Sequence, residues 1–277
     1  MTYTTPTAGP RGAPPHAIVT GGSDGIGRAA AIRLAEAGFA LTLIARRPAL
    51  LEEAARAVDT RGAAPVGFIA CDVADEAALG GAIASAEAAR GPCHTLVTAA
   101  GTVRPGRFEA LDAAAFRQQM DVNYFGTVAA VRAVYPGMVA RKAGRIGMIA
   151  SAAALIGVFG YTAYAGSKFA VRGFAEALRG EAKAQGITVT LCYPGDTDTA
   201  QYAEEMTSRP RETAAIAGKA SLTDPDRVAR ALLRGLDRGR FAVYPGFEVS
   251  VLGHTGSLIA PFLNLSFDRV VRRLAGR

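Results

Sequence analysis

The sequence contains no tryptophan, and it has only three histidines and three cysteines among its 277 residues. The histidines are far apart in the chain, so they form no cluster that would suggest a metal site. The cysteines, Cys71, Cys93 and Cys192, lack paired metal-ligand spacing and stand in apolar runs typical of strands. This pattern favours buried free thiols in a reducing, cytoplasmic compartment.

Long hydrophobic runs are absent as well. The segment 249–267 comes nearest to eighteen uninterrupted apolar residues, but Gly253, Pro261 and Asn264 are among the residues that break it. It resembles a segment that lies at a membrane surface more than one that crosses a membrane. Residues 1–15 lack the apolar core of a signal peptide and are expected to form a flexible leader. We expect a cytoplasmic protein, peripheral at the membrane if its tail binds there.

Acidic residues are fewer than basic ones, which leaves a formal net charge of +7. The arginines are nevertheless scattered, and no basic run is interleaved with stacking aromatic residues. This distribution argues against nucleic acid as a partner. Half of the residues are hydrophobic, so residues 16–277 are expected to fold as one domain with a sizeable core.

Short apolar runs alternate with longer segments in which apolar residues recur every three or four positions. The expected strands are 16–20, 40–45, 66–70, 95–98, 145–150 and 187–193, and the expected helices are 27–37, 49–58, 76–90, 111–140 and 163–184. This alternation predicts an α/β fold with a doubly wound parallel sheet of the Rossmann type. A polar stretch at 200–222 is expected to be a mobile lid over the substrate, and 245–277 an apolar and basic C-terminal extension.

A glycine-rich loop follows the first expected strand and leads into a helix. Such a loop allows the backbone to approach a pyrophosphate, whose charge is favoured by the exposed amides at the helix N-terminus. The alternative is a loop that merely turns the chain, and the carboxylate of Asp24 counts against a nearby phosphate. The candidate dinucleotide-binding residues here are Gly21, Ser23, Asp24, Gly25, Ile26 and Gly27.

The second expected strand ends in Arg46 and Arg47, where a carboxylate would be needed to bind an adenine ribose diol. Arginine can donate two parallel hydrogen bonds to a ribose 2′-phosphate, so NADP(H) is predicted in preference to NAD(H). A solvated surface pair is the alternative. Asp72 and Val73 follow the third strand and are placed for the adenine ring, although Asp72 is equally suited to cap a helix.

Tyr164 and Lys168 are four residues apart in an expected helix, so their side chains share one face. A tyrosine with a pKa of roughly 10 is a poor acid at neutral pH, and a nearby ammonium favours its phenolate and lowers that pKa. Tyr161 is the rival phenol, but it lies nearly two turns from Lys168. The pair therefore indicates acid–base chemistry at a carbonyl oxygen, with Tyr164 as the acid.

The glycine loop together with Ser151, Tyr164 and Lys168 resembles the short-chain dehydrogenase/reductase family over about residues 16–200. The resemblance implies that Tyr164 protonates the substrate carbonyl oxygen, that Ser151 hydrogen-bonds this oxygen, and that Lys168 holds the nicotinamide ribose. It also implies that Asn123 orders a water in a proton relay. A local kink satisfied by Asn123 and a strand-end cap formed by Ser151 are the alternatives.

The same resemblance implies that the turn after the sixth strand contacts the nicotinamide carboxamide, with Thr197 and Thr199 as candidates. One departure is Thr98, which stands where the family usually has asparagine. Three stretches, 157–181, 193–206 and 266–273, resemble more closely the 3-ketodihydrosphingosine reductases, a group within the family that reduces a long-chain amino ketone with NADPH. Gly195, in place of a second proline, and Leu50, which lacks the basic character common after the cofactor arginine, depart from that group. So does the lack of a membrane segment before the cofactor domain.

The implied substrate is a lipophilic small molecule, which suits the tail. Its apolar residues between 247 and 267, followed by Arg269, Arg272 and Arg273, would contact a membrane surface, cover an alkyl chain or pack at a subunit interface. A homo-oligomer, dimer or tetramer, is expected. There are two alternative functions. One is reduction of another lipophilic ketone or of a 3-oxoacyl thioester, and the other is a sensor that binds NADP(H) without catalysis.

Overall fold

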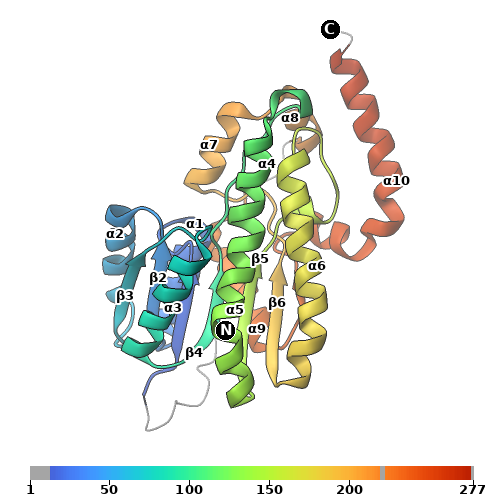
Figure 1. Cartoon of the computed structure of the whole chain (residues 1–277). Helices are drawn as coiled ribbons and strands as arrows, with labels where there is room; N and C mark the ends of the chain where they lie inside the picture. The colour runs from blue at the N-terminus through green and yellow to red at the C-terminus, as the bar shows by residue number, and fades with distance from the viewer. Residues whose placement is uncertain (1–12, 219–221, 276–277) are drawn as a thin grey trace.

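The computed structural model describes residues 13–218 and 222–275, and its centre is a seven-stranded sheet (Figure 1). The strands are β1 His16–Thr20, β2 Ala40–Ala45, β3 Val66–Ala70, β4 Cys93–Thr98, β5 Gly144–Ile149, β6 Ile187–Cys192 and β7 Ala242–Val243. Their order is β3-β2-β1-β4-β5-β6-β7, and every neighbouring pair is parallel. The chain reverses its direction of travel across the sheet between β1 and β4, which is where open α/β sheets bind ligands.

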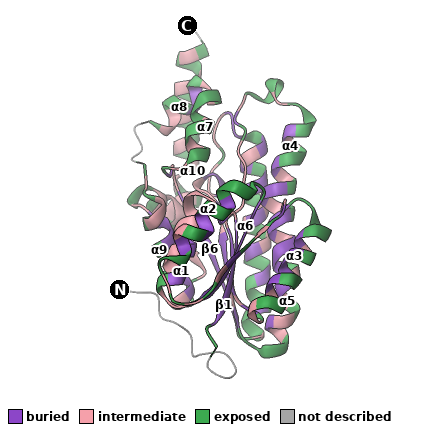
Figure 2. Ribbon diagram, turned by 90° about the vertical axis from the view of Figure 1, so that its left-hand side faces the viewer, coloured by how far each residue is buried: buried purple, intermediate pink, exposed green. Residues whose placement is uncertain are grey.

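Helices cover both faces of the sheet. They are α1 Gly25–Glu36, α2 Pro48–Asp59, α3 Glu76–Arg90, α4 Ala113–Met120, α5 Gly126–Arg141, α6 Thr162–Ala184, α7 Ala200–Ser208, α8 Arg211–Ala217, α9 Pro225–Asp237 and α10 Phe247–Ala275. One core cluster lies between the sheet and α1, α2 and α9, and the other between the sheet and α3, α5 and α6. Figure 2 shows the buried residues gathered on the strands and on the inward faces of these helices. The doubly wound Rossmann prediction is confirmed.

The expected boundaries of the first three strands and of α3 agree with the structure. The expected single helix over 111–140 is wrong. The chain there forms α4, the π-helical turn η3 at Asp121–Phe125, and α5, after a short 3₁₀ turn at Phe108–Ala110. The side chain of Asn123 binds the backbone of Thr102, and Thr127 Oγ1 donates to the Asn123 carbonyl at 2.8 Å. The two bonds to Thr102 are tertiary and the one from Thr127 is local; together they stabilise the π turn, which the apolar pattern alone does not reveal.

The stretch expected as a lid contains two helices, α7 and α8, between residues 200 and 217. Thr213 Oγ1 donates to the Phe159 carbonyl at 2.7 Å, and the Arg107 guanidinium pairs with the buried Glu212. Both contacts tie α8 to loops beside the carboxyl ends of the strands. Residues 219–221 of the expected lid, and residues 1–12 of the expected leader, lie outside the described residues; mobility of the lid stays a prediction.

The C-terminal segment forms α10, a helix of 29 residues that runs along one side of the molecule (Figure 1). None of its described residues is buried. It begins against the body, where Val249 packs on the core cluster beside Tyr244. Within the described parts of the chain, no helix is both long and apolar enough to cross a membrane.

Candidate functional site

The glycine loop turns tightly at the carboxyl end of β1. Gly21 has a φ of +71°, and its amide donates to the Ile44 carbonyl at 2.8 Å. A Cβ at Gly27 would lie 2.2 Å from the Gly21 carbonyl oxygen, so only glycine allows the start of α1 to approach the loop this closely. The exposed amides of a helix N-terminus then face the space above the strand ends, which fits a pyrophosphate.

Asp24 caps α1, because its carboxylate accepts from the Gly25 amide at 2.7 Å. No acidic residue follows in the first turn of the helix. Ser23 is half-buried in the same turn, and Ile26 packs against the core cluster under α1 and α2. The Asp24 carboxylate, whose charge counts against a nearby phosphate, is thus hydrogen-bonded to the backbone of its own loop.

The two arginines after β2 are exposed. Arg46 Nη1 lies 3.9 Å from Asp72 Oδ2, which brings together the ends of β2 and β3, on the side of the sheet where an adenosine would lie. Asp72 does not cap a helix: its Oδ1 accepts from the Ala74 amide at 3.0 Å, and Asp75 caps α3 instead. The helix-cap alternative for Asp72 is therefore wrong. Val73 is buried directly against Gly126.

Ser151 and Tyr164 meet at the end of β5. Ser151 Oγ accepts from the Ala153 amide at 3.1 Å, so the residue caps the short turn that follows the strand. Its side chain lies close enough to the Tyr164 phenol to affect the pKa of that phenol. Burial raises the pKa of Tyr164 to about 12; Ser151 lowers it, and the charges of Glu205 and Asp196 raise it. The expected depression of the phenol pKa is thus not found.

The reason lies in the position of Lys168. Its ammonium lies 5.8 Å from the centre of the Tyr164 ring and donates to the Ile149 carbonyl at 3.1 Å. The side chain is buried, and burial lowers the pKa of Lys168 to about 8. The predicted pairing of phenol and ammonium on one helix face is present, but the ammonium faces the ring and the strand end rather than the phenol oxygen.

Asn123 connects three segments of the site. Its Oδ1 accepts from the Thr102 amide at 2.8 Å, and its Nδ2 donates to the Thr102 carbonyl at 2.9 Å and to Ser167 Oγ at 2.8 Å. Ser167 Oγ in turn donates to the Tyr164 carbonyl at 2.7 Å. Asn123 and Lys168 both approach Gly101, where a Cβ would lie 3.3 Å from Oδ1 and 3.6 Å from Nζ. The predicted catalytic residues therefore share one place, braced by two residues that the sequence did not single out.

The turn after β6 closes over the glycine loop. Thr199 caps α7, and its methyl group would lie 2.9 Å from a Cβ at Gly25. Thr197 is buried and forms an isolated parallel bridge with Thr223. Thr199 therefore lies beside the start of α1, and Thr197 lies two residues earlier in the same turn.

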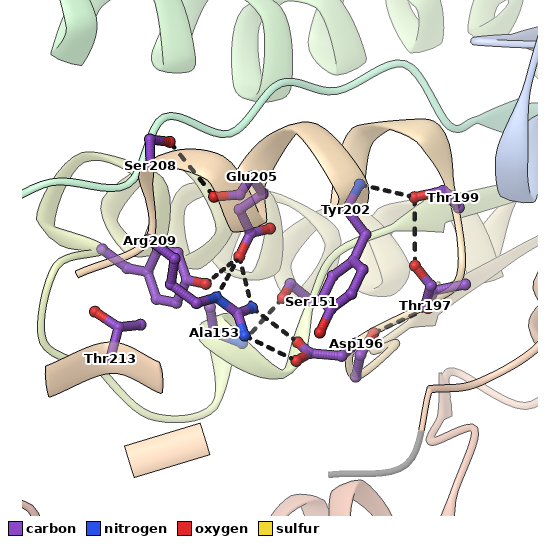
Figure 3. A network of polar contacts seen from close by, with 12 residues as sticks. Ser151, Ala153, Asp196, Thr197, Thr199, Tyr202, Glu205, Ser208, Arg209 and Thr213 are labelled. Atoms are coloured by element: carbon purple, nitrogen blue, oxygen red, sulfur yellow. Dashed lines mark hydrogen bonds and ion pairs between the residues drawn. The ribbon is translucent and has the colours of Figure 1, made fainter. Parts of the chain in front are cut away.

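The rival phenol, Tyr161, is engaged elsewhere. Its hydroxyl donates to Glu205, and burial raises its pKa, as does the charge of Glu205. Arg209 binds the same carboxylate and also Asp196, so the four side chains form one network. Figure 3 shows Arg209 between Glu205 and Asp196. The sequence did not predict this network. Asp196 lies in the turn after β6 and Arg209 at the end of α7, and no helical or strand spacing relates two residues so placed.

Thr98, where the family usually has asparagine, lies buried at the end of β4. Its hydroxyl oxygen has no hydrogen-bond partner among the described residues. The segment after β4 is braced by Asn123 through the backbone of Thr102.

A cavity of about 850 Å³ opens beside these residues. The loop 102–111 forms one wall, α7 and α8 form another, and Leu274 near the end of α10 also lines it. Its polar lining includes Glu204 and Glu205. This volume suits a small-molecule ligand. Ser151, Tyr164 and Lys168 do not line the cavity, which adjoins the site through Thr102, a partner of Asn123, and through Glu205, a partner of Tyr161.

Comparison with known proteins agrees with this geometry. The family model of short chain dehydrogenases matches residues 15–210. A 3-dehydrosphinganine reductase of Danio rerio is 40% identical over 93% of this chain and 86% of its own length, and a 3-ketodihydrosphingosine reductase of Mus musculus is 36% identical over 91% and 77%. The crystal structure of a levodione reductase has the same fold, with a TM-score of 0.78 at 23% identity, covering 85% of this chain and 98% of its own. The chain belongs to the short-chain dehydrogenase/reductase family and is an oxidoreductase that uses a nicotinamide cofactor.

Proposed function

We propose that this protein reduces the ketone of 3-ketodihydrosphingosine to the alcohol dihydrosphingosine with NADPH, a step of sphingolipid base synthesis. The observation that carries the proposal is the similarity to reductases of this name along most of both chains. That similarity covers 93% of the chain in one case, whereas the general family model stops at residue 210. The part beyond residue 210, which helps to line the cavity, is therefore shared with these reductases.

In this proposal Tyr164 donates the proton to the carbonyl oxygen, and Ser151, whose side chain lies near the phenol, donates a second hydrogen bond to the same oxygen. When bound, the nicotinamide supplies the hydride to the carbonyl carbon. The two groups hold the carbonyl at the carboxyl ends of the strands, next to the glycine loop that fits the dinucleotide. The hydroxyl of Tyr161 is excluded as the acid because it is bonded to Glu205.

Lys168 has two roles in the proposal, binding the nicotinamide ribose and favouring the phenolate of Tyr164. Its buried ammonium has one described hydrogen bond, to the Ile149 carbonyl, and so keeps donors for ribose hydroxyls. Asn123 holds the backbone of Thr102 and Ser167 in place and is proposed to order the water that returns the proton to Tyr164. The structural role and the relay role of Asn123 are compatible, because they use different atoms. The side-chain amide makes the structural contacts, and the backbone carbonyl is the group proposed to bind the water.

NADPH is preferred over NADH in this proposal because Arg46 and Arg47 are exposed at the end of β2. A guanidinium there can bind a 2′-phosphate. The nearest described carboxylate to Arg46, that of Asp72, is 3.9 Å away and about half exposed. Arg46 can therefore exchange this weak surface pair for a phosphate at small cost.

The tail is proposed to contact a membrane surface that holds the lipophilic substrate. Its exposed apolar residues are Phe247, Val251, Leu258, Phe262 and Leu265. At 3.6 residues per turn these positions fall within about 60° of one another around α10. Arg269, Arg272 and Arg273 continue the same face, a combination that suits anionic lipid headgroups. Assembly as a homo-oligomer through this or another surface stays a prediction.

A substrate panel tests the function. Purified protein is given 3-ketodihydrosphingosine, a 3-oxoacyl thioester and a simple lipophilic ketone, and oxidation of NADPH and of NADH is followed. We expect the highest kcat/KM for 3-ketodihydrosphingosine with NADPH. Efficient reduction of the thioester or of the simple ketone without turnover of 3-ketodihydrosphingosine would leave the family assignment intact and remove the proposed substrate.

A further inference from the structure

Two carboxylates share one guanidinium beside the proposed acid. Arg209 Nε and Nη2 donate to Glu205 Oε1 at 3.0 and 2.6 Å, while Nη1 and Nη2 donate to the two oxygens of Asp196 at 3.2 and 3.3 Å. Tyr161 donates to the same oxygen of Glu205. The side chain of Arg209 is only 5% exposed, and Figure 3 shows its fork directed at both carboxylates. The network is therefore ordered and largely shielded from water.

The network adjoins the reacting groups. The Ala152 amide donates to the Pro194 carbonyl at 2.8 Å, which places the segment that begins with Ser151 against the turn that holds Asp196. The charges of Glu205 and Asp196 both act on the Tyr164 phenol and raise its pKa. Glu205 also lines the cavity described above. The ring of Tyr161, whose hydroxyl donates to Glu205, lies 5.7 Å from the ring of Tyr164 between centroids, so a carbonyl bound at Tyr164 lies near this network.

The charges in the network do not balance. At neutral pH one guanidinium faces two carboxylates, and among residues 13–218 and 222–275 no other lysine or arginine lies within ion-pair distance of either one. A net negative charge in a partly buried place is costly unless a cation is present. In this protein the net negative charge has a second cost, because it destabilises the phenolate of Tyr164. Both costs are removed if the ligand itself brings a positive charge to this point.

We propose that Asp196 and Glu205, held in place by Arg209, bind the ammonium group that 3-ketodihydrosphingosine carries on the carbon next to its ketone. This inference rests on the proposed function and adds the feature of the substrate that is recognised. The side chain of Asp196 is 27% exposed, which leaves lone pairs free for the ammonium. Glu205 Oε2 accepts no hydrogen bond from the described residues, since the bonds from Arg209 and Tyr161 all end on Oε1. The network thereby selects amino ketones over neutral ketones of equal length.

The test compares three ketones of the same chain length: 3-ketodihydrosphingosine, its N-acetyl derivative and the analogue without the amino group. The unmodified protein should have the highest kcat/KM for the free amine. Asp196→Asn should lower that value by about 10-fold to 100-fold, as expected for a lost hydrogen bond between charged groups, while kcat/KM for the two neutral ketones stays within about threefold. Asp198→Asn is the matched control, because this aspartate is exposed and two residues away.

Asp196→Asn also removes a partner of Arg209, so NADPH affinity and the thermal midpoint are measured alongside. Should this variant fail to fold, Glu205→Gln, which keeps the size of the side chain, and the ranking of the three ketones by the unmodified protein decide the matter. Equal losses for charged and neutral ketones would assign the network a structural role and overturn the inference. So would reduction of all three ketones with equal efficiency by the unmodified protein, although the proposed function would stand. Absence of any turnover of 3-ketodihydrosphingosine would remove the proposed function itself.

Discussion

The cofactor end of the molecule and its substrate end are held together by different kinds of contact. At the cofactor end, backbones touch: a Cβ at Gly27 would collide with the Gly21 carbonyl, and one at Gly21 would lie 2.5 Å from the Ala100 amide. At the substrate end, α7 and α8 are tied down by ion pairs of Arg209 and Arg107, and α10 buries no described residue. Backbone packing tolerates little change, whereas side-chain pairs can be exchanged.

This difference matches the division of labour within the fold. The dinucleotide and the reacting carbonyl need fixed positions, because misplacement of the reacting atoms by a small distance lowers the rate steeply. Choice of substrate needs a surface that can vary while the sheet stays the same. The predictions below test the rigid end first, where the largest effects are expected, and then the adaptable end.

Replacing the proposed acid should have the largest effect. Tyr164→Phe should lower kcat by about 100-fold to 10,000-fold, the range for loss of one general acid, and leave NADPH affinity nearly unchanged. Steady-state kinetics and cofactor fluorescence titration measure the two effects. Tyr161→Phe is the matched control, since its hydroxyl serves Glu205. A severe loss with Tyr161→Phe and a mild one with Tyr164→Phe would reverse the assignment.

Lys168→Ala should damage both catalysis and cofactor binding, because one ammonium is proposed to serve the ribose and the phenol. We expect kcat/KM to fall about 100-fold and the Kd for NADPH to rise about tenfold, the scale of hydrogen bonds to charged groups. Lys183→Ala, at the exposed end of the same helix, should change neither. Cofactor affinity that survives Lys168→Ala intact contradicts the double role.

Arg46→Ala tests the cofactor preference. Removing a guanidinium bonded to a 2′-phosphate should raise the KM for NADPH about tenfold or more, with little effect on NADH. Arg61→Ala, which removes another exposed arginine from the same part of the chain, serves as the control. Equal use of NADPH and NADH by the unmodified protein would remove the argument from Arg46.

The substrate end is tested through α10. Phe262→Asp should weaken sedimentation with vesicles that contain anionic phospholipid by about tenfold, the scale of one large apolar side chain withdrawn from an interface. Asn264→Asp introduces the same charge on the opposite face of the helix and should act weakly. A change in oligomeric state with Phe262→Asp, at unchanged vesicle binding, would instead identify this face as a subunit interface.

The smallest effect concerns stability at low pH and arises at the amino ends of the strands, opposite the cofactor end. His16 is buried between the Gly91 carbonyl and Thr42 Oγ1, and burial lowers its pKa to about 4. The unfolded chain, with a pKa near 6.5, takes up a proton first, so stability from this residue is present above pH 6.5 and is lost as pH falls toward 4. From pH 7 to 5.5 the free energy of unfolding should fall by about 1 kcal/mol on account of His16.

Chemical denaturation at the two pH values measures this change, and His16→Asn should reduce the difference between them. His94, whose pKa burial likewise lowers to about 4, adds to the total and remains in that variant. A free energy of unfolding that does not change between pH 7 and 5.5 would mean that His16 is not held neutral.

Much of the fold and of the site followed from local patterns. The strand boundaries of β1 to β3 follow from short apolar runs, and the position of Tyr164 relative to Lys168 follows from helical spacing. Patterns failed where tertiary bonds override local preference. The π turn at Asn123 depends on Thr102, and the raised pKa of Tyr164 depends on burial and on carboxylates from distant segments. The contact between Arg209 and Asp196 likewise depends on the packing of α7 against the turn after β6.

The sequence alone determined the class of chemistry, because a glycine loop after a strand and a phenol one helical turn from an ammonium are local features with few other uses. Only the tertiary structure decided that Tyr161 binds Glu205, where the Lys168 ammonium points, and that two carboxylates with a single guanidinium adjoin Tyr164. These are questions of distance between segments far apart in the chain. Such distances are fixed by packing around the sheet, which no local pattern specifies.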